Sequence, residues 1–144
     1  MQANALGDVG EMEAAIYFRS QGFFVSKPIG DAPYDLVVDD GDRLFTVEVK
    51  TTETKKYDRR PMKNGQPRGP RSWDWHVTPD PSKGFDYLYC NTPDHHFLIP
   101  RSVIPTKGRT CINLPKGDYV SKCKWMRYII HDPPSMEHRV PQAI

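Results

Sequence analysis

The stretch Tyr34–Thr51 reads YDLVVDDGDRLFTVEVKT and contains two apolar runs on either side of the turn-forming tetrad 39–42. Alternating apolar runs that flank such a turn predict a β-hairpin. Because strand side chains alternate with a period of two, Phe45, Val47 and Val49 should share one face of the second strand. The opposite face should then carry Leu44, Thr46, Glu48 and Lys50.

Charged residues occupy unusual positions in this hairpin. Asp35 stands at the start of the first strand, and Glu48 and Lys50 lie inside the second. Burying such groups without partners would cost several kcal/mol. Their positions are explained if a metal ion and a phosphate group bind at this corner. The alternative interpretation is a solvated strand face with an ordinary Glu48–Lys50 pair.

Length and composition indicate one folded domain. The chain has 144 residues, of which 38% are hydrophobic and 26% charged. It lacks both an apolar run long enough for a membrane span and the features of a secretory signal. Its three cysteines do not suggest a disulfide framework. We therefore expect a cytoplasmic protein, which a phage or a mobile genetic element could encode.

Positive charge is concentrated after the hairpin. Residues 55–72 carry a net charge of +6, against +2 for the whole chain. Prolines and glycines predict an irregular loop over residues 53–72. The loop could bind an anionic ligand, with nearby aromatic residues stacking on bases, or it could simply be solvated. Its candidate DNA-binding residues are Lys55, Lys56, Arg59, Arg60, Lys63, Arg68 and Arg71, followed by Trp73 and Trp75.

A helix is predicted over residues 6–20, ahead of the hairpin. Apolar stripes on two of its sides predict that it is largely buried. Glu11 is the only charge in the stripe of mostly small residues, where it could also pair with Arg19 or a nearby lysine. Further strands are expected at 22–25, 73–77, 85–90, 96–99, 109–114 and 124–130, with a helical turn at 101–104 and a tail from about 133.

The order of acids resembles the PD-(D/E)XK nuclease superfamily. Glu11 lies on the helix, Asp35 starts a strand, and residues 48–50 read E-V-K on the next strand. The name-giving proline is displaced, because Tyr34 precedes the aspartate and the proline is Pro33. The local pattern is similar to archaeal Holliday junction resolvases and to small homing and restriction-type endonucleases. The resemblance implies an α/β (α+β) fold, with a restriction-endonuclease-like αβββ core, a mixed central sheet and additional C-terminal strands.

The resemblance also implies the catalytic groups. These are Glu11, Asp35, Glu48 and Lys50. Asp35, Glu48 and the backbone carbonyl of Val49 would hold Mg²⁺, for which Mn²⁺ could substitute, and Glu11 would bind it directly or through water. The ion would activate water and neutralise charge during phosphodiester hydrolysis. Lys50 would orient or help to deprotonate the water, or stabilise the phosphoryl charge.

The expected activity is that of a metal-dependent DNA endonuclease. A loop and further strands follow E-V-K, whereas the resolvases continue promptly into a helix. This difference favours a site-specific double-strand cutter of homing or restriction type over a Holliday junction resolvase. A DNA-binding protein without catalysis is the third possibility. Cutting two strands predicts a homodimer or homotetramer.

Overall fold

The computed structural model describes residues 3–52, 55–57, 62–66, 70–80, 84–106, 112–114 and 124–131. Helix α1 (Ala3–Ser20) comes first and ends before Gly22, whose φ of 85° suits the end of a helix. The strands are β1 (Phe24–Ser26), β2 (Leu36–Asp39), β3 (Leu44–Thr51), β4 (Lys55–Tyr57), β5 (Pro70–Val77), β6 (Tyr87–Asn91), β7 (His96–Pro100) and β8 (Ile112–Leu114). Short 3-10 helices are η1 (Arg101–Val103) and η3 (Met126–Tyr128).

The central sheet has five strands in the order β1-β2-β3-β6-β7. All neighbouring pairs are antiparallel except β3 and β6, which run parallel, so the sheet is mixed. The predicted hairpin is present as β2 and β3, with Leu36 opposite Val47. In its turn, Asp40 Oδ1 accepts hydrogen bonds from the N–H groups of Asp42 and Arg43. The predicted core of a helix and a mixed sheet, with further strands after it, is therefore confirmed.

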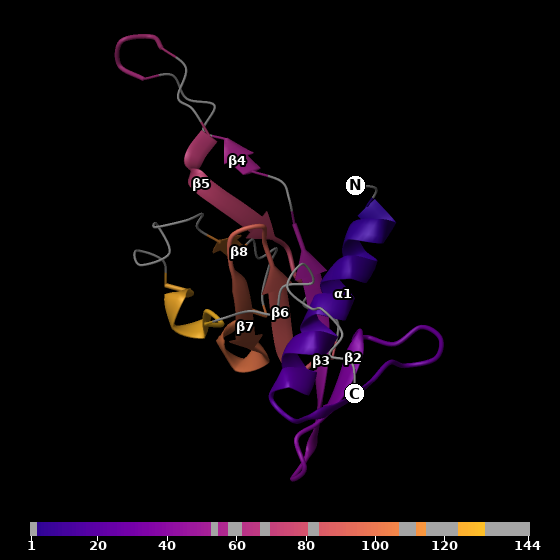
Figure 1. Ribbon diagram of the computed structural model, residues 1–144. Helices are drawn as coiled ribbons and strands as arrows, with labels where there is room; N and C mark the ends of the chain where they lie inside the picture. Colours follow the sequence, from indigo (N-terminus) through magenta and orange to yellow (C-terminus); the bar gives the residue numbers. More distant parts are fainter. Residues whose placement is uncertain are drawn as a thin grey trace, which may run out of the picture.

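The two faces of β3 have different surroundings, as its alternation predicts. Phe45, Val47 and Val49 are buried in a cluster that includes Ala14 and Phe18 of α1. The other face of the sheet packs against the smaller sheet β4-β5-β8, through a second buried cluster that includes Leu88, Phe97, Ile99, Ile112, Leu114 and Trp125. Each such large apolar side chain contributes about 1.5–3 kcal/mol when fully buried. Figure 1 shows α1 lying across β2 and β3 on one side of the sheet.

One apolar stripe of α1 does not pack as predicted. The stripe with Ala14 and Phe18 faces the sheet, but Met12, on the other stripe, is 52% exposed. The helix therefore buries one side rather than two. None of the helices in the described part of the chain is both long enough and apolar enough to cross a membrane.

The prediction of an irregular loop over residues 53–72 was wrong at both ends. β4 occupies 55–57 and β5 begins at Pro70, and the two strands pair antiparallel with a register shift between Lys55 and Tyr57. Pro70 is compatible with the strand because it is the first residue, a position that strands allow to proline. Figure 1 shows this ribbon pointing away from the central sheet.

The C-terminal strand predicted at 124–130 was also wrong. This segment contains η3, and it pairs with the sheet through the bridge between Ile129 and Phe97 and the hydrogen bond from the Ile130 N–H to the His96 carbonyl rather than as a continuous strand. Trp125 and Ile130 are buried in different clusters, so this apolar run is divided between two cores instead of lining one strand face. Of the strand predicted at 109–114, residues 112–114 are present as β8. The tail predicted from 133 lies outside the described residues.

Candidate active site

Asp35 is tied to the second strand of the hairpin by two hydrogen bonds. Its backbone N–H donates to the carbonyl of Val47 at 2.9 Å, just before β2 begins. Its side-chain Oδ2 accepts from the N–H of Val49 at 2.7 Å. The carboxylate therefore lies beside the Glu48–Val49 peptide, where the strand register brings it towards the E-V-K segment.

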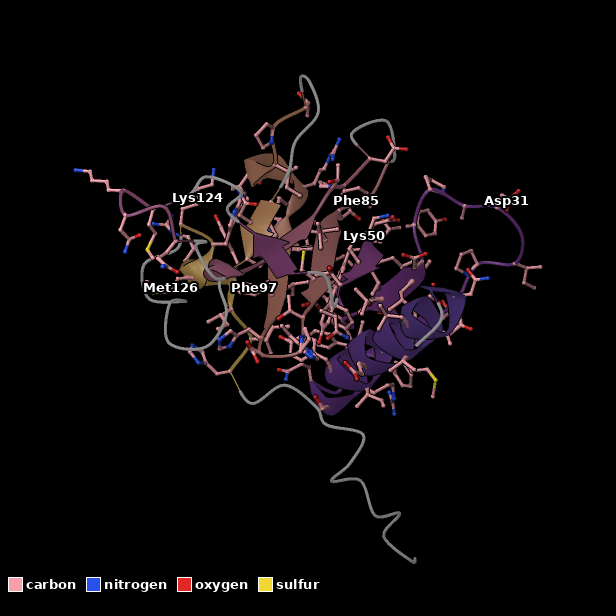
Figure 2. The ribbon with its side chains drawn as sticks, turned by 90° about the horizontal axis from the view of Figure 1, so that it is seen from above. Asp31, Lys50, Phe85, Phe97, Lys124 and Met126 are labelled. Atoms are coloured by element: carbon pink, nitrogen blue, oxygen red, sulfur yellow. The ribbon has the colours of Figure 1, made fainter. Side chains whose placement is uncertain are left out.

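Glu48 and Lys50 form an ion pair on β3. Lys50 Nζ lies 3.3 Å from Glu48 Oε1, and the side chains are 34% and 2% exposed respectively. Both project from the face of β3 opposite α1, and their partners across the parallel pairing are Leu88 and Cys90 of β6. A carboxylate buried this deeply needs a close positive charge, because losing one partner of a buried pair is strongly destabilising. Figure 2 labels Lys50 on the central sheet, with the indigo helix α1 below it in this view.

Gly10 allows the helix to approach the end of β3. A Cβ atom at Gly10 would lie 1.8 Å from Oγ1 of Thr51, a distance that real Cβ atoms do not show, and 3.0 Å from Cβ of Thr51, which is tighter than most real contacts. Only glycine fits this contact. Glu11, a candidate site residue, directly follows this close contact between α1 and the end of β3.

Glu11 pairs with Lys27, which follows β1. Glu11 Oε2 lies 2.7 Å from Lys27 Nζ, and the side chains are 22% and 65% exposed. Pairing with a nearby lysine was the alternative interpretation of Glu11, and the structure contains that pair. The hydrogen bond to Glu11 is the main cause that raises the pKa of Lys27, and the charges of Asp8 and Asp35 raise it further. Lys27 therefore lies in the field of three carboxylates.

Sequence reasoning missed Lys27 as a residue of this site. β1 pairs antiparallel with β2, with Ser26 opposite Val37. Continuing this register places Lys27 opposite Leu36, immediately beside Asp35. No local pattern in the sequence carries this information, because it depends on the register between two strands separated by a nine-residue loop, 27–35.

A second polar cluster, also missed, joins α1 to β6 and β7. Glu13 Oε2 accepts a hydrogen bond from Asn91 Nδ2 and lies 3.4 Å from His96 Nε2. His96 Nδ1 lies 2.7 Å from the hydroxyl of Tyr89. A neutral imidazole protonated on Nε2 satisfies both contacts. The cluster also reaches the exit of β3, because Thr52 N–H donates to the Asn91 carbonyl at 3.0 Å.

Burial keeps this histidine neutral. His96 is 8% exposed, and its desolvation lowers its pKa to about 4, with a further contribution from neighbouring His95. The pKa of Tyr89 is raised, chiefly by burial as well. The cluster is thus an uncharged hydrogen-bonded link around one carboxylate, and it fixes α1 to the sheet on the side away from Lys27.

The predicted DNA-binding residues lie largely on the projecting ribbon. Lys55 and Lys56 belong to β4, and the strand β5 contains Arg71, Trp73 and Trp75. Lys63 is exposed in the described segment 62–66. The remaining predicted positions, Arg59, Arg60 and Arg68, lie outside the described residues. The structure thus places several basic residues of this segment on strands rather than on an irregular loop.

The oxygen donors at this corner have the chemistry that a hard divalent cation prefers. The Asp35 carboxylate accepts a hydrogen bond from the Val49 N–H, so it lies next to the part of β3 that carries Glu48 and the Val49 carbonyl. Within the described ranges, however, no three His, Cys, Asp or Glu side chains form a ready cluster for a metal ion. Two of the four catalytic candidates are instead neutralised by lysines, as Glu11–Lys27 and Glu48–Lys50. The oxygen ligands at this corner are of the kind that binds a metal ion, and two of the carboxylates, Glu11 and Glu48, are paired with lysines.

Comparisons with known proteins agree with this arrangement. The sequence model of a family described as PD-(D/E)XK endonuclease matches residues 1–114. No curated protein matches the chain. Among solved structures, the bacterial homing endonuclease I-Ssp6803I is similar with a TM-score of 0.68 and 22% identity, over 89% of this chain and 86% of that chain. Hjc, a Holliday junction resolvase from the archaeal hyperthermophile Archaeoglobus fulgidus, is similar with a TM-score of 0.50 and 16% identity, over 74% of this chain and 83% of that chain. At these identities the two structures show a shared fold.

Proposed function

The chain belongs to the PD-(D/E)XK endonuclease family, and from this we propose that it is a metal-dependent DNA endonuclease, a site-specific double-strand cutter of homing or restriction type. The observation that carries the proposal is the buried Glu48–Lys50 pair next to an aspartate held on the Val49 amide. A solvated strand face would not bury the carboxylate to 2% exposure. Because burying a carboxylate is costly, the position of Glu48 supports a catalytic role rather than a surface role that only improves solubility.

Three groups would hold the divalent ion, namely the carboxylates of Asp35 and Glu48 and the backbone carbonyl of Val49. Glu11 would join them directly or through a water molecule. Mg²⁺ is the proposed ion and Mn²⁺ its substitute. When bound, the ion supplies an activated water and neutralises phosphoryl charge. Lys50 acts from the same face as Glu48, where it orients the attacking water or donates hydrogen bonds to the phosphoryl oxygens.

The projecting ribbon is the proposed DNA-binding surface. β4, β5 and the segment between them carry all seven basic residues of positions 55–72. Lysine and arginine bind phosphates and release counterions, so binding should weaken steeply with salt. Arginines can also read guanine edges in the major groove, and Trp73 and Trp75 can stack on bases. The position of β4 directly after β3 supports this role, because DNA on the ribbon would extend towards the catalytic corner.

A Holliday junction resolvase is the second candidate, supported by the fold shared with Hjc. The strands that follow β3 favour the site-specific cutter, because a sequence reader needs a surface beyond the catalytic core. A DNA-binding protein without catalysis is the third candidate. Either nuclease cuts two strands, so we propose a homodimer or homotetramer.

Cleavage assays separate these candidates. The protein is incubated with a random-sequence DNA library, a plasmid and a synthetic four-way junction, with Mg²⁺ or with EDTA. The proposal expects double-strand cuts at a restricted set of library sequences with Mg²⁺ and none with EDTA. Symmetric nicking of the junction alone would replace it by the resolvase. Mobility shifts without cuts in either condition would leave only a binding protein.

A further inference from the structure

Lys27 holds an unusual position among the acids of the site. Its Nζ is 2.7 Å from Glu11 Oε2, and the charges of Asp8 and Asp35 act on it as well. Asp8 lies three residues before Glu11 on α1, so both side chains are on one side of the helix. Asp35 is brought close by the antiparallel pairing of β1 with β2. The Lys27 ammonium group therefore pairs with Glu11 and is also attracted by the charges of Asp8, on the same helix, and Asp35, which precedes β2.

Carboxylates outnumber the ammonium group around Lys27. The acids that act on it are Glu11, Asp8 and Asp35. Three carboxylates and one ammonium group leave an excess of two negative charges, which is the charge that a divalent ion would neutralise. Lys50 is fixed beside the buried Glu48. The Lys27 side chain is 65% exposed, and it extends from the loop that follows β1.

We propose that Lys27 is a tethered cation that pairs with Glu11 and competes with a divalent ion for that carboxylate. The proposal rests on the proposed function, since it needs Glu11 to bind the ion. Glu11 Oε2 cannot serve an ammonium at 2.7 Å and a metal ion equally well. Because Lys27 is exposed, it can rotate into solvent with little loss of stability when the ion arrives. The lysine sets the metal concentration at which the Glu11 ligand becomes available.

Metal binding without DNA tests the proposal, because no cleavage enters the readout. Mn²⁺ is titrated into the full chain by isothermal titration calorimetry. Lys27→Met should bind Mn²⁺ about three- to tenfold more tightly than the wild type, as expected when a nearby positive charge and an exposed ion pair are removed. Lys27→Arg keeps the charge and should stay within about twofold of the wild type.

The matched control is Lys124→Met, which makes the same change in net charge at a distance. Lys124 is exposed and lies 4.8 Å from the ring of Trp125. Figure 2 shows it on the side of the molecule remote from α1. Its Mn²⁺ affinity should equal that of the wild type. In a Glu11→Gln background, Lys27→Met should lose its effect, because the carboxylate for which lysine and metal compete is gone.

Two failures can be distinguished. If Lys27→Met and the wild type bind Mn²⁺ equally through a site that Asp35→Asn weakens, the competition is refuted and the proposed metal site stands. If the wild type binds no Mn²⁺, or binds it independently of Asp35 and Glu48, the metal site of the proposed function fails, and the role of Lys27 fails with it.

Discussion

The two carboxylate–lysine pairs of the candidate site differ in distance and in burial. Glu48 and Lys50 are 3.3 Å apart with the carboxylate 2% exposed, whereas Glu11 and Lys27 are 2.7 Å apart with 22% and 65% exposure. The shorter pair is the more exposed one, so distance alone does not rank them. Exposed pairs contribute about 0–1 kcal/mol, whereas breaking a buried pair costs about 3–5 kcal/mol. We infer a fixed catalytic pair and an exchangeable one.

The largest effect is expected where the buried pair is broken. Lys50→Met should reduce the cleavage rate at saturating Mg²⁺ by at least about 10²-fold, because a general acid–base or charge-stabilising group contributes about 10²–10⁴-fold. The cleavage rate is measured on a supercoiled plasmid. Lys124→Met, which removes an exposed lysine far from the corner, should cleave like the wild type. A Lys50→Met enzyme of normal rate would show that the buried pair is only structural.

The contact that brings Glu11 to the corner can be broken separately. Gly10→Ala should lower the free energy of unfolding by about 1–3 kcal/mol, the usual cost of overpacking, because its Cβ would meet Thr51 Oγ1 at 1.8 Å. Gly7→Ala is the matched control, since its Cβ meets nothing within 4 Å. It should stabilise the protein by up to about 1 kcal/mol through helix propensity. Urea denaturation measures both variants, and equal stabilities would contradict the close packing of α1 on β3.

The free energy of unfolding should depend on pH through His96, which belongs to the polar cluster that fixes α1 to β6 and β7. The pKa of His96 is lowered to about 4 in the folded protein, whereas an unfolded histidine titrates near 6.5. Above pH 6.5 both states are neutral and the full stability is present. As pH falls from 6.5 towards 4, the unfolded state takes up the proton first, so stability falls by about 1 kcal/mol per pH unit from this group. His96→Gln should flatten this slope in urea denaturation at pH 5 to 7, and an unchanged slope would contradict a buried neutral histidine.

The smallest effect is expected for the exposed pair. Lys27→Met should change the free energy of unfolding by less than about 0.5 kcal/mol, because exposed ion pairs contribute little. Urea denaturation at pH 7 measures it beside the Gly10→Ala variant. A loss above about 2 kcal/mol would mean that Lys27 is a structural residue, and the contrast between the two pairs would disappear.

Much of the core could be predicted because it depends on local patterns. The turn residues and the period of two were enough for the hairpin, and they placed Phe45, Val47 and Val49 on the face that packs against α1. Glu11, the lone charge in a stripe of mostly small residues, pointed to a helix position with a special role. The contact of Gly10 with Thr51 gives the physical reason for the glycine.

The remainder depended on contacts between distant segments. Lys27 enters the site through the register of β1 on β2, and Glu13 meets Asn91 and His96 across 78 or more positions. The strand expected at 73–77 is most of β5, but β4 and the first residues of β5 were missed, because the prolines and glycines between the two strands outweigh a three-residue strand in any local reading. The apolar run at 124–130 was mistaken for a strand because composition does not reveal that Trp125 and Ile130 belong to different cores.

Glu48→Gln tests the central claim most directly. It removes the buried charge and keeps the shape of the side chain, so the fold should persist, as circular dichroism can verify. Plasmid and library cleavage should fall by at least about 10²-fold with Mg²⁺, in line with loss of an electrostatic group in a buried site. DNA affinity, measured by fluorescence anisotropy, should stay within about threefold of the wild type. A Glu48→Gln protein that cuts DNA at the wild-type rate would show that the metal, water and phosphate do not meet at this corner.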